Sequence, residues 1–317
     1  MTTSTRVLAS VLVVGVVAAI AFLLGRMSAG PEIPSTGNLD SSGIRRIAGG
    51  SYEASGLAAV PGDSQFLFVD DGQEREIFLL GFSSDGLQTG DAIALPFPAD
   101  VTDMEGVTTD GHFFYVVGSQ SKKTGFDGDG LVRFTFDPRA RRIADIERIQ
   151  GLKGWLAENV AELRGTGRLP GDEVLNIEGL AWDPTNRRLL LGLRAPVVAD
   201  SALVVPIRLA DSTRAFTTNN LTVDGATLRL PLGGAGIRGI EWDALTGAFL
   251  VIVGASLNDE NRDFRVLEWD GRSGSQLREI ATYDRRLKPE GIASATIAGN
   301  PSRVVVFDVG HVAVMRE

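Results

Sequence analysis

The sequence contains no cysteine and only two histidines, His112 and His311. The lack of cysteine excludes disulfide bonds, a thiolate nucleophile and any site in which cysteine binds zinc or an iron–sulfur cluster. Two histidines are too few for a metal site built from several imidazoles. The chemistry of this chain must therefore come from carboxylates, hydroxyl groups, lysine and arginine.

Positive charge is also scarce. Lys and Arg number 31 against 40 Asp and Glu, which makes the formal net charge −9 at pH 7. Binding to nucleic acid needs a basic surface that neutralises phosphates, so we expect no nucleic-acid partner. Hydrophobic residues make up 44% and charged residues 22%, which is the composition of a globular protein and excludes a disordered chain.

One long uncharged hydrophobic run lies near the N-terminus, at residues 7–25, between Arg6 and Arg26. About 20 apolar residues span a bilayer, whereas the core of a cleaved signal peptide has about 7–15. We therefore expect residues 1–30 to be a signal anchor, with a cleaved signal peptide as the alternative. Residues 31–42 have the composition of a linker.

The charge around this segment predicts its orientation. Arg6 and the amino terminus lie on one side, and the chain beyond Arg26 is acidic. The positive-inside rule then places the C-terminal body outside the cytoplasm, in the periplasm or at the cell surface. If the segment is cleaved, the protein is secreted.

A fivefold repeat follows. Each copy begins with a small or charged residue, which is followed by a glycine and a short apolar strand. A turn and a second apolar strand come next. The copies begin at Ser55-Gly56, Glu105-Gly106, Glu178-Gly179, Arg238-Gly239 and Glu290-Gly291. Turn dipeptides such as Pro-Gly, Asp-Gly and Asp-Pro separate the paired strands.

Further strands complete each copy. A third apolar strand is predicted at residues 75–82, 131–137, 202–209, 264–270 and 311–315, and a fourth at 92–97, 145–150, 227–232 and 277–283. The fifth copy ends after three strands, and residues 43–50 precede the first copy as a fourth strand would. Four short antiparallel strands per repeat are typical of propeller blades. We therefore predict an all-β, five-bladed β-propeller over residues 43–317, in preference to six blades.

The longest spacing between copies contains an insertion at about residues 151–173. Leu152, Trp155, Leu156, Val160 and Leu163 fall on one face of a helix. This pattern predicts a short amphipathic helix over 152–164, with a plain surface loop as the alternative.

Several segments resemble a known family. They are GSQSKKTGFDGDGLVRF, LNIEGLAWDP, LLLGLRAP, LPLGGAGIRGIEWD, FRVLEWDG and KPEGIA. These resemble the signature segments of the domain of unknown function 3616 family, over roughly residues 45–310. More loosely, the Glu-Gly-hydrophobic repeats are similar to the SdiA-regulated and esterase-like phytase propellers. The resemblance implies the propeller fold and no particular activity. Ser55 and Arg238 depart from the repeat, because the other three copies carry Glu before the motif glycine.

The repeat also predicts a site. The residue before each motif glycine starts the innermost strand, so these residues should ring one mouth of the central channel. Loops that leave the second strands reach the same face, and charge that converges on a concave surface is typical of binding sites. The candidate ligand-binding residues are Glu105, Glu178, Arg238, Glu290, Arg194, Asn176, Ser119 and Asp71.

Two roles remain open for these residues. The glutamates could hold neighbouring blades together by hydrogen bonds, with Arg238 present to neutralise them. Alternatively they bind a ligand, and Glu105, Glu178 and Glu290 are then candidate ligands of a hard divalent cation such as calcium. Whether the protein is an enzyme stays open. We favour a membrane-tethered propeller that binds a small molecule or an extracytoplasmic protein at the channel mouth. The alternative is a metal-dependent hydrolase of the phosphoesterase or lactonase type.

Overall fold

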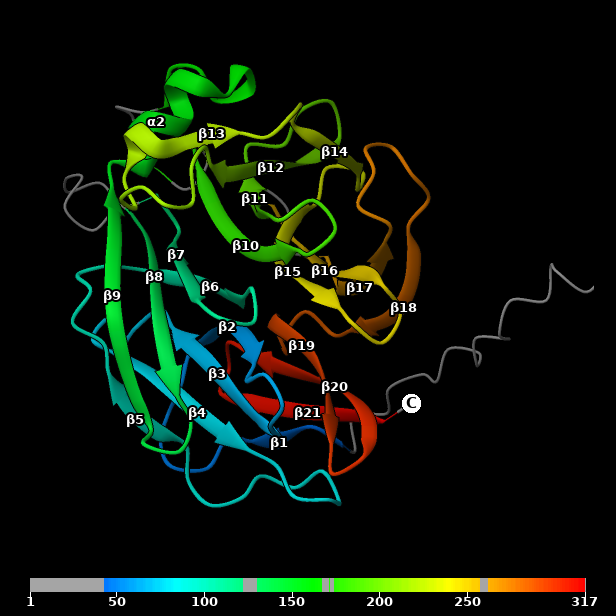
Figure 1. The fold of residues 1–317 in the computed structure, drawn as a ribbon. Coiled ribbons are helices and arrows are strands. Elements are labelled where there is room, and N and C mark those ends of the chain that lie inside the picture. The colour runs from blue at the N-terminus through cyan, green and yellow to red at the C-terminus, as the bar shows by residue number, and fades with distance from the viewer. Residues whose placement is uncertain (1–42, 122–129, 167–170, 172–173, 257–261, 317) are drawn as a thin grey trace, which may run out of the picture. The chain divides into compact units, whose positions relative to one another are not determined.

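Five antiparallel sheets stand around a common centre (Figure 1). The structure is a computed structural model that describes residues 43–121, 130–166, 171, 174–256 and 262–316. The predicted anchor at residues 7–25 lies outside these residues. Within the described part of the chain, no helix is long and apolar enough to cross a membrane.

The first two blades follow the predicted four-strand order. Blade 1 comprises β2 (Ala54–Ala59), β3 (Gln65–Asp70), β4 (Glu76–Gly81) and β5 (Ile93–Pro96). Blade 2 comprises β6 (Met104–Thr109), β7 (Phe114–Gly118), β8 (Gly130–Asp137) and β9 (Arg142–Gln150). Each strand pairs antiparallel with its neighbour in the chain.

The third and fourth blades repeat this order, with one addition. Blade 3 comprises β10 (Asn176–Asp183), β11 (Arg188–Ala195), β12 (Ser201–Leu209), β13 (Leu221–Val223) and β14 (Leu228–Pro231). Blade 4 comprises β15 (Gly236–Asp243), β16 (Ala248–Gly254), β17 (Phe264–Trp269) and β18 (Arg278–Tyr283). In blade 3, β13 and the predicted β14 pair with different halves of β12. The three-residue β13 was not predicted.

The fifth blade joins the two ends of the propeller. It comprises β19 (Pro289–Ile297), β20 (Asn300–Phe307), β21 (His311–Arg316) and β1 (Arg45–Arg46). Arg45 and Arg46 pair with Val312 and His311 on β21. The prediction that residues 43–50 complete the last blade is thus confirmed, as are the five blades. This closure covers an edge of β21 that would otherwise be exposed.

The insertion contains a helix, as predicted. Helix α2 (Leu152–Asn159) ends earlier than expected, and a 3₁₀ turn, η3 (Ala161–Leu163), follows it. Leu152, Leu156 and Leu163 are buried in the hydrophobic cluster between blades 2 and 3. A second 3₁₀ turn, η5 (Thr218–Asn220), precedes β13.

The core consists of five hydrophobic clusters, each lying between two neighbouring blades. Strand β3 shows how one strand serves two of them. Phe66 and Phe68 belong to the cluster with blade 5, whereas Leu67 and Val69 belong to the cluster with blade 2. Because successive side chains point to opposite faces of a sheet, a strand buried on both faces must be apolar throughout.

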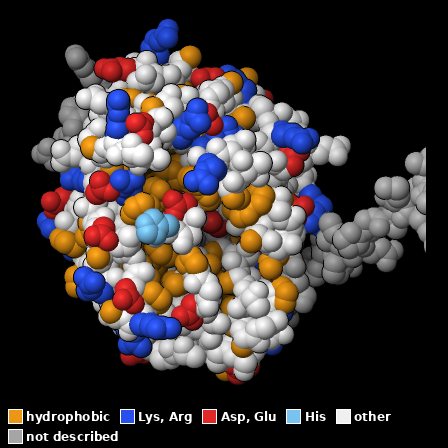
Figure 2. All heavy atoms as spheres, viewed as in Figure 1, with side chains coloured by type: hydrophobic (Ala, Val, Ile, Leu, Met, Phe, Trp, Pro, Cys, Tyr) orange, Lys and Arg blue, Asp and Glu red, His pale blue; other side chains and the backbone are white. Residues whose placement is uncertain are grey.

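One face of the molecule carries interspersed acidic and basic side chains (Figure 2). On the face seen in Figure 2, red and blue side chains alternate around a central region where hydrophobic side chains are visible. The described part of this face carries no continuous patch of one charge.

The repeated motif is a β-bulge. In blades 2 to 5 the register between the first and second strands shifts at the residue before the motif glycine, namely Glu105, Glu178, Arg238 and Glu290. In blade 1 the shift lies between Ala54 and Leu57. A bulge leaves one residue outside the ladder and redirects its side chain. The side chains of these residues therefore need not follow the alternation between the two faces of the sheet. They are free to point into the channel mouth.

The glycine after each bulge lies against the next blade. A Cβ on Gly239 would stand 2.2 Å from the backbone oxygen of Glu290, and a Cβ on Gly56 would stand 2.7 Å from the backbone nitrogen of Val107. No side chain fits at these distances, so glycine permits the innermost strands to approach one another.

Gly239→Ala is therefore expected to destabilise the propeller by about 2 kcal/mol, because the methyl group must push two backbones apart. Gly154→Ala is the matched control, since it lies within helix α2 with nothing within 4 Å of its Cβ position. That substitution should stabilise the protein by about 0.5–1 kcal/mol. Urea unfolding of both variants measures the difference, and equal stabilities would contradict the close-packing role.

Candidate functional site

The bulge residues and the ends of the second strands meet at one mouth of the channel. Backbone hydrogen bonds of the same kind fix this arrangement in three blades. Asp71 donates its N–H to Glu53, Ser119 to Asp103 and Asp308 to Lys288, at 3.3, 2.9 and 2.9 Å. Each bond ties the residue after a second strand to the residue before a first strand.

A cavity of about 590 Å³ opens at this mouth. Its lining is formed by Glu53, Asp71, Glu105, Glu178, Arg194, Arg238, Ala255, Arg262, Phe264, Arg285, Lys288, Glu290 and Asp308. All but two of these residues are charged. The lining arginines and lysine belong to blades 3 and 4 and to the loop that leads into blade 5, whereas blades 1 and 2 contribute only acidic residues.

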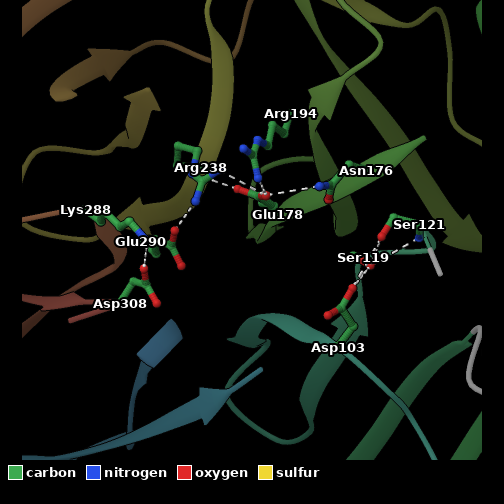
Figure 3. A network of polar contacts seen from close by, with 10 residues as sticks. All are labelled: Asp103, Ser119, Ser121, Asn176, Glu178, Arg194, Arg238, Lys288, Glu290 and Asp308. Carbon is green, nitrogen blue, oxygen red and sulfur yellow. Dashed lines mark hydrogen bonds and ion pairs between the residues drawn. The ribbon is translucent and has the colours of Figure 1, made fainter. Parts of the chain in front are cut away.

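Glu178 and Arg238 form the centre of the charged network (Figure 3). Glu178, with 2% of its surface exposed, accepts hydrogen bonds from Arg194 at 2.7 Å, Arg238 at 3.2 Å and Asn176 at 3.2 Å. The Nε of Arg238 lies 2.8 Å from the second carboxylate oxygen of Glu178. The Nη2 of Arg238 also pairs with Glu290. One guanidinium thus bridges carboxylates of blades 3 and 5.

Burial and charge act in opposite directions on these groups. Burial alone would lower the pKa of Arg238, but the carboxylates of Glu178 and Glu290 raise it, so the guanidinium stays charged. Burial raises the pKa of Glu290 to about 7 even though Arg238 lowers it. Arg238 is therefore a permanent cation, whereas burial and the charge of Arg238 act in opposite directions on the pKa of the Glu290 carboxyl group.

A second cluster lies in blades 1 and 2. Asp103 has a left-handed backbone, with φ of 57°, at the entry to β6, and its carboxylate accepts hydrogen bonds from Ser119 and Ser121. One carboxylate oxygen from each of Asp71, Asp103 and Glu105 lies within 4.8 Å of the other two. These three residues are the group in the described chain that could hold a metal ion.

Two carboxyl groups of this cluster, those of Glu105 and Asp71, have raised pKa values. Burial, followed by the charges of Glu178 and Glu290, raises the pKa of Glu105 well above its usual range. Burial and the adjacent carboxylate of Glu53 raise the pKa of Asp71 to about 7. Perturbed carboxyl groups of this kind are frequent at functional sites, although ion-pair networks also produce them.

The structure brings the predicted site residues together. Six of them line the cavity, namely Glu105, Glu178, Arg238, Glu290, Arg194 and Asp71. The other two lie beside it, because Asn176 hydrogen-bonds to Glu178 and Ser119 to Asp103. The predicted metal ligands are divided, since Glu178 and Glu290 pair with Arg238 while Glu105 groups with Asp71 and Asp103.

Sequence reasoning missed four lining residues, the charged Arg262 and Arg285 and the apolar Ala255 and Phe264. Arg285 lies in the loop between β18 and β19, the same kind of loop that positions Asp103 and Lys288. That equivalence was a signal that could have identified it. Arg262 belongs to the loop between β16 and β17, and nothing in its local sequence marks it.

The chain belongs to a family of proteins of unknown function, DUF3616, whose model matches residues 139–310. The structure is similar to the pyranose dehydrogenase PQQ domain from Coprinopsis cinerea, with 11% identity and a TM-score of 0.50, covering 90% of this chain and 98% of that one.

Two further solved structures are similar at lower scores. The glutaminyl cyclase of Myxococcus xanthus has 11% identity and a TM-score of 0.46, with 86% of this chain and 95% of that one covered. The aldose sugar dehydrogenase of Escherichia coli has 12% identity and a TM-score of 0.48, with 86% and 98% covered. A search of curated protein sequences found no match. At 11% identity, the likeness to the pyranose dehydrogenase PQQ domain shows a similar fold and nothing more.

The raised pKa of Asp71 predicts a pH dependence. A carboxyl group whose pKa rises from 3.8 to about 7 on folding favours the folded state at low pH, and this contribution is lost as pH rises through 7. Asp71→Asn cannot ionise, so wild type should lose stability relative to the variant between about pH 4 and pH 7.

Urea unfolding across this range, with chelator present, measures the effect. Glu158→Gln, on an exposed position of helix α2, should follow the wild-type profile. Parallel profiles for wild type and Asp71→Asn would show that Asp71 ionises freely in the folded protein.

Proposed function

We propose that this protein binds a small polar molecule in the cavity at the channel mouth. The observation that carries the proposal is the cavity itself, because about 590 Å³ is within the range of small-molecule sites and nearly all of its lining is charged. A concave site of this size suits a small molecule better than the surface of a protein partner.

Part of the lining is held by ion pairs within the protein itself. Glu178, Arg238 and Glu290 are held on strands by mutual ion pairs, and Lys288 pairs with Asp308. Side chains that are already ordered lose little conformational entropy on binding, which favours affinity.

The chemistry of the lining indicates the kind of ligand. Carboxylates accept hydrogen bonds, and guanidinium groups donate them. Phe264 and Ala255 add a small apolar surface. A compound with many hydroxyl groups, which both donate and accept, matches this mixture, as does a zwitterion.

We further propose that the propeller works outside the cytoplasm, tethered to the membrane through residues 7–25. The hydrophobic run between Arg6 and Arg26 supports this location.

A metal-dependent hydrolase of phosphoesters or lactones is the second candidate. The cluster of Asp71, Asp103 and Glu105 favours it, because a cation held there would polarise a bound carbonyl or phosphoryl group. Hydrolysis of lactones or phosphoesters only with a divalent cation added would support this candidate over binding alone.

A thermal-shift screen of sugars, sugar acids and amino acids tests the binding proposal. A ligand at a hundred times its dissociation constant stabilises by about 2.7 kcal/mol, and the melting temperature should rise by roughly 5 °C. Arg194→Gln should weaken the response at least tenfold in concentration, because Arg194 lines the cavity.

Arg214→Gln is the control, since this exposed arginine pairs with Asp211 and is not part of the lining. It should respond as wild type does. A screen without any stabilising compound, or equal responses in Arg194→Gln and wild type, would contradict binding at this cavity.

A further inference from the structure

We propose that Asp71, Asp103 and Glu105 form a binding site for a divalent cation, with calcium as the best match. This inference goes beyond the binding of an organic molecule, because a cation could be held here whether or not such a ligand is present. It also differs from a site made by Glu105, Glu178 and Glu290.

The spacing of the carboxylates suits a single ion. Oxygen ligands lie 2.3–2.6 Å from calcium, so two ligands on opposite sides of the ion are about 4.6–5.2 Å apart. The three carboxylate oxygens all lie within 4.8 Å of one another. This spacing brings the three carboxylates within reach of a single calcium ion.

Glu105 is the strongest indication of a ligand. Its side chain is 9% exposed and lines the cavity, yet among the described residues it accepts no hydrogen bond and forms no ion pair. Buried carboxylates are normally paired, hydrogen-bonded or bound to a metal. The bulge at Glu105 fixes this side chain at the mouth, where a cation would satisfy it.

The surroundings supply what a metal site usually needs. Ser119 and Ser121 hydrogen-bond to one oxygen of Asp103, and such outer contacts orient ligating carboxylates. One oxygen of Asp71 is buried with no hydrogen-bond partner.

Asn176 provides a separate observation next to this cluster. Its side chain is 4% exposed and its amide oxygen has no hydrogen-bond partner. The N–H of Ile177 donates to the backbone oxygen of Ser119 at 2.9 Å, which places Asn176 beside the Ser119–Asp103 pair. Amide oxygens are common calcium ligands, so this part of the mouth holds a neutral oxygen in addition to the carboxylates.

The opposite side of the mouth is already neutralised. Arg238 pairs with both Glu178 and Glu290, and a cation bound there would be repelled by the guanidinium. The cation should therefore bind on the side of blades 1 and 2. Protons are the competing way to neutralise the three carboxylates, and the experiment distinguishes the two.

The test uses the full-length chain, stripped with chelator and then supplied with calcium, magnesium or manganese alone. Thermal unfolding should show a rise of roughly 5 °C with saturating calcium, reversed by chelator. Asp71→Asn and Glu105→Gln should each reduce the calcium affinity at least tenfold. Mn²⁺ binding measured by electron paramagnetic resonance on the folded variants gives an independent readout that does not depend on stability.

Two controls separate this site from the alternatives. Glu290→Gln should keep the calcium response, because Glu290 belongs to the Arg238 pair. Glu279→Gln, on strand β18 at the outside of blade 4, should also keep it. The proposal is overturned if no cation raises the melting temperature, which would leave protons as the neutralising species. It is also overturned if Glu290→Gln abolishes the response as fully as Glu105→Gln does. Either failure leaves the proposed binding of an organic ligand untouched, because that test measures the response to organic compounds and not to added cations.

Discussion

The channel mouth depends on one interaction, the double ion pair of Arg238 with Glu178 and Glu290. The bulges of blades 2 to 5 place four side chains at the channel mouth, and three of these side chains are glutamates. Like charges so close together repel strongly in a partly buried site. The guanidinium at the fourth position pairs with two of them, and Arg194 supplies a second positive charge to Glu178. This pairing gives a physical reason for blade 4 to depart from the glutamate of blades 2, 3 and 5.

The channel mouth therefore has two halves that differ in charge pairing. Blades 3 to 5 carry paired charges that are fixed in position, whereas blades 1 and 2 carry the carboxylates of Asp71, Asp103 and Glu105. We propose that the paired half presents donors and acceptors to an organic ligand and that the acidic half presents oxygens to a cation. Glu105 is the one glutamate of the three that Arg238 does not pair with, and burial together with the charges of the other two raises its pKa well above the usual range.

Much of the fold could be predicted because its signals are local. Turn dipeptides and apolar strands define the blades, and the missing fourth strand of the last blade points to residues 43–50. The site was predictable only as a set of residues that share a face. The grouping of the carboxylates depends on distances of a few ångströms between blades, which the sequence does not contain. The repeat grouped Glu105 with Glu178 and Glu290, whereas the structure groups it with Asp71 and Asp103. The bulges and β13 were missed because a register shift and a three-residue strand leave no periodic pattern.

The stability of Arg238→Met, alone and combined with Glu290→Gln, tests the central role of the ion pair most directly. Removing one partner of a buried pair leaves an uncompensated charge, and the single variant should lose about 3 kcal/mol of unfolding free energy at pH 8. Adding Glu290→Gln removes one of the two carboxylates left without Arg238 and should restore part of that loss. A single variant within 0.5 kcal/mol of wild type, or a double variant that is less stable than the single one, would contradict the account.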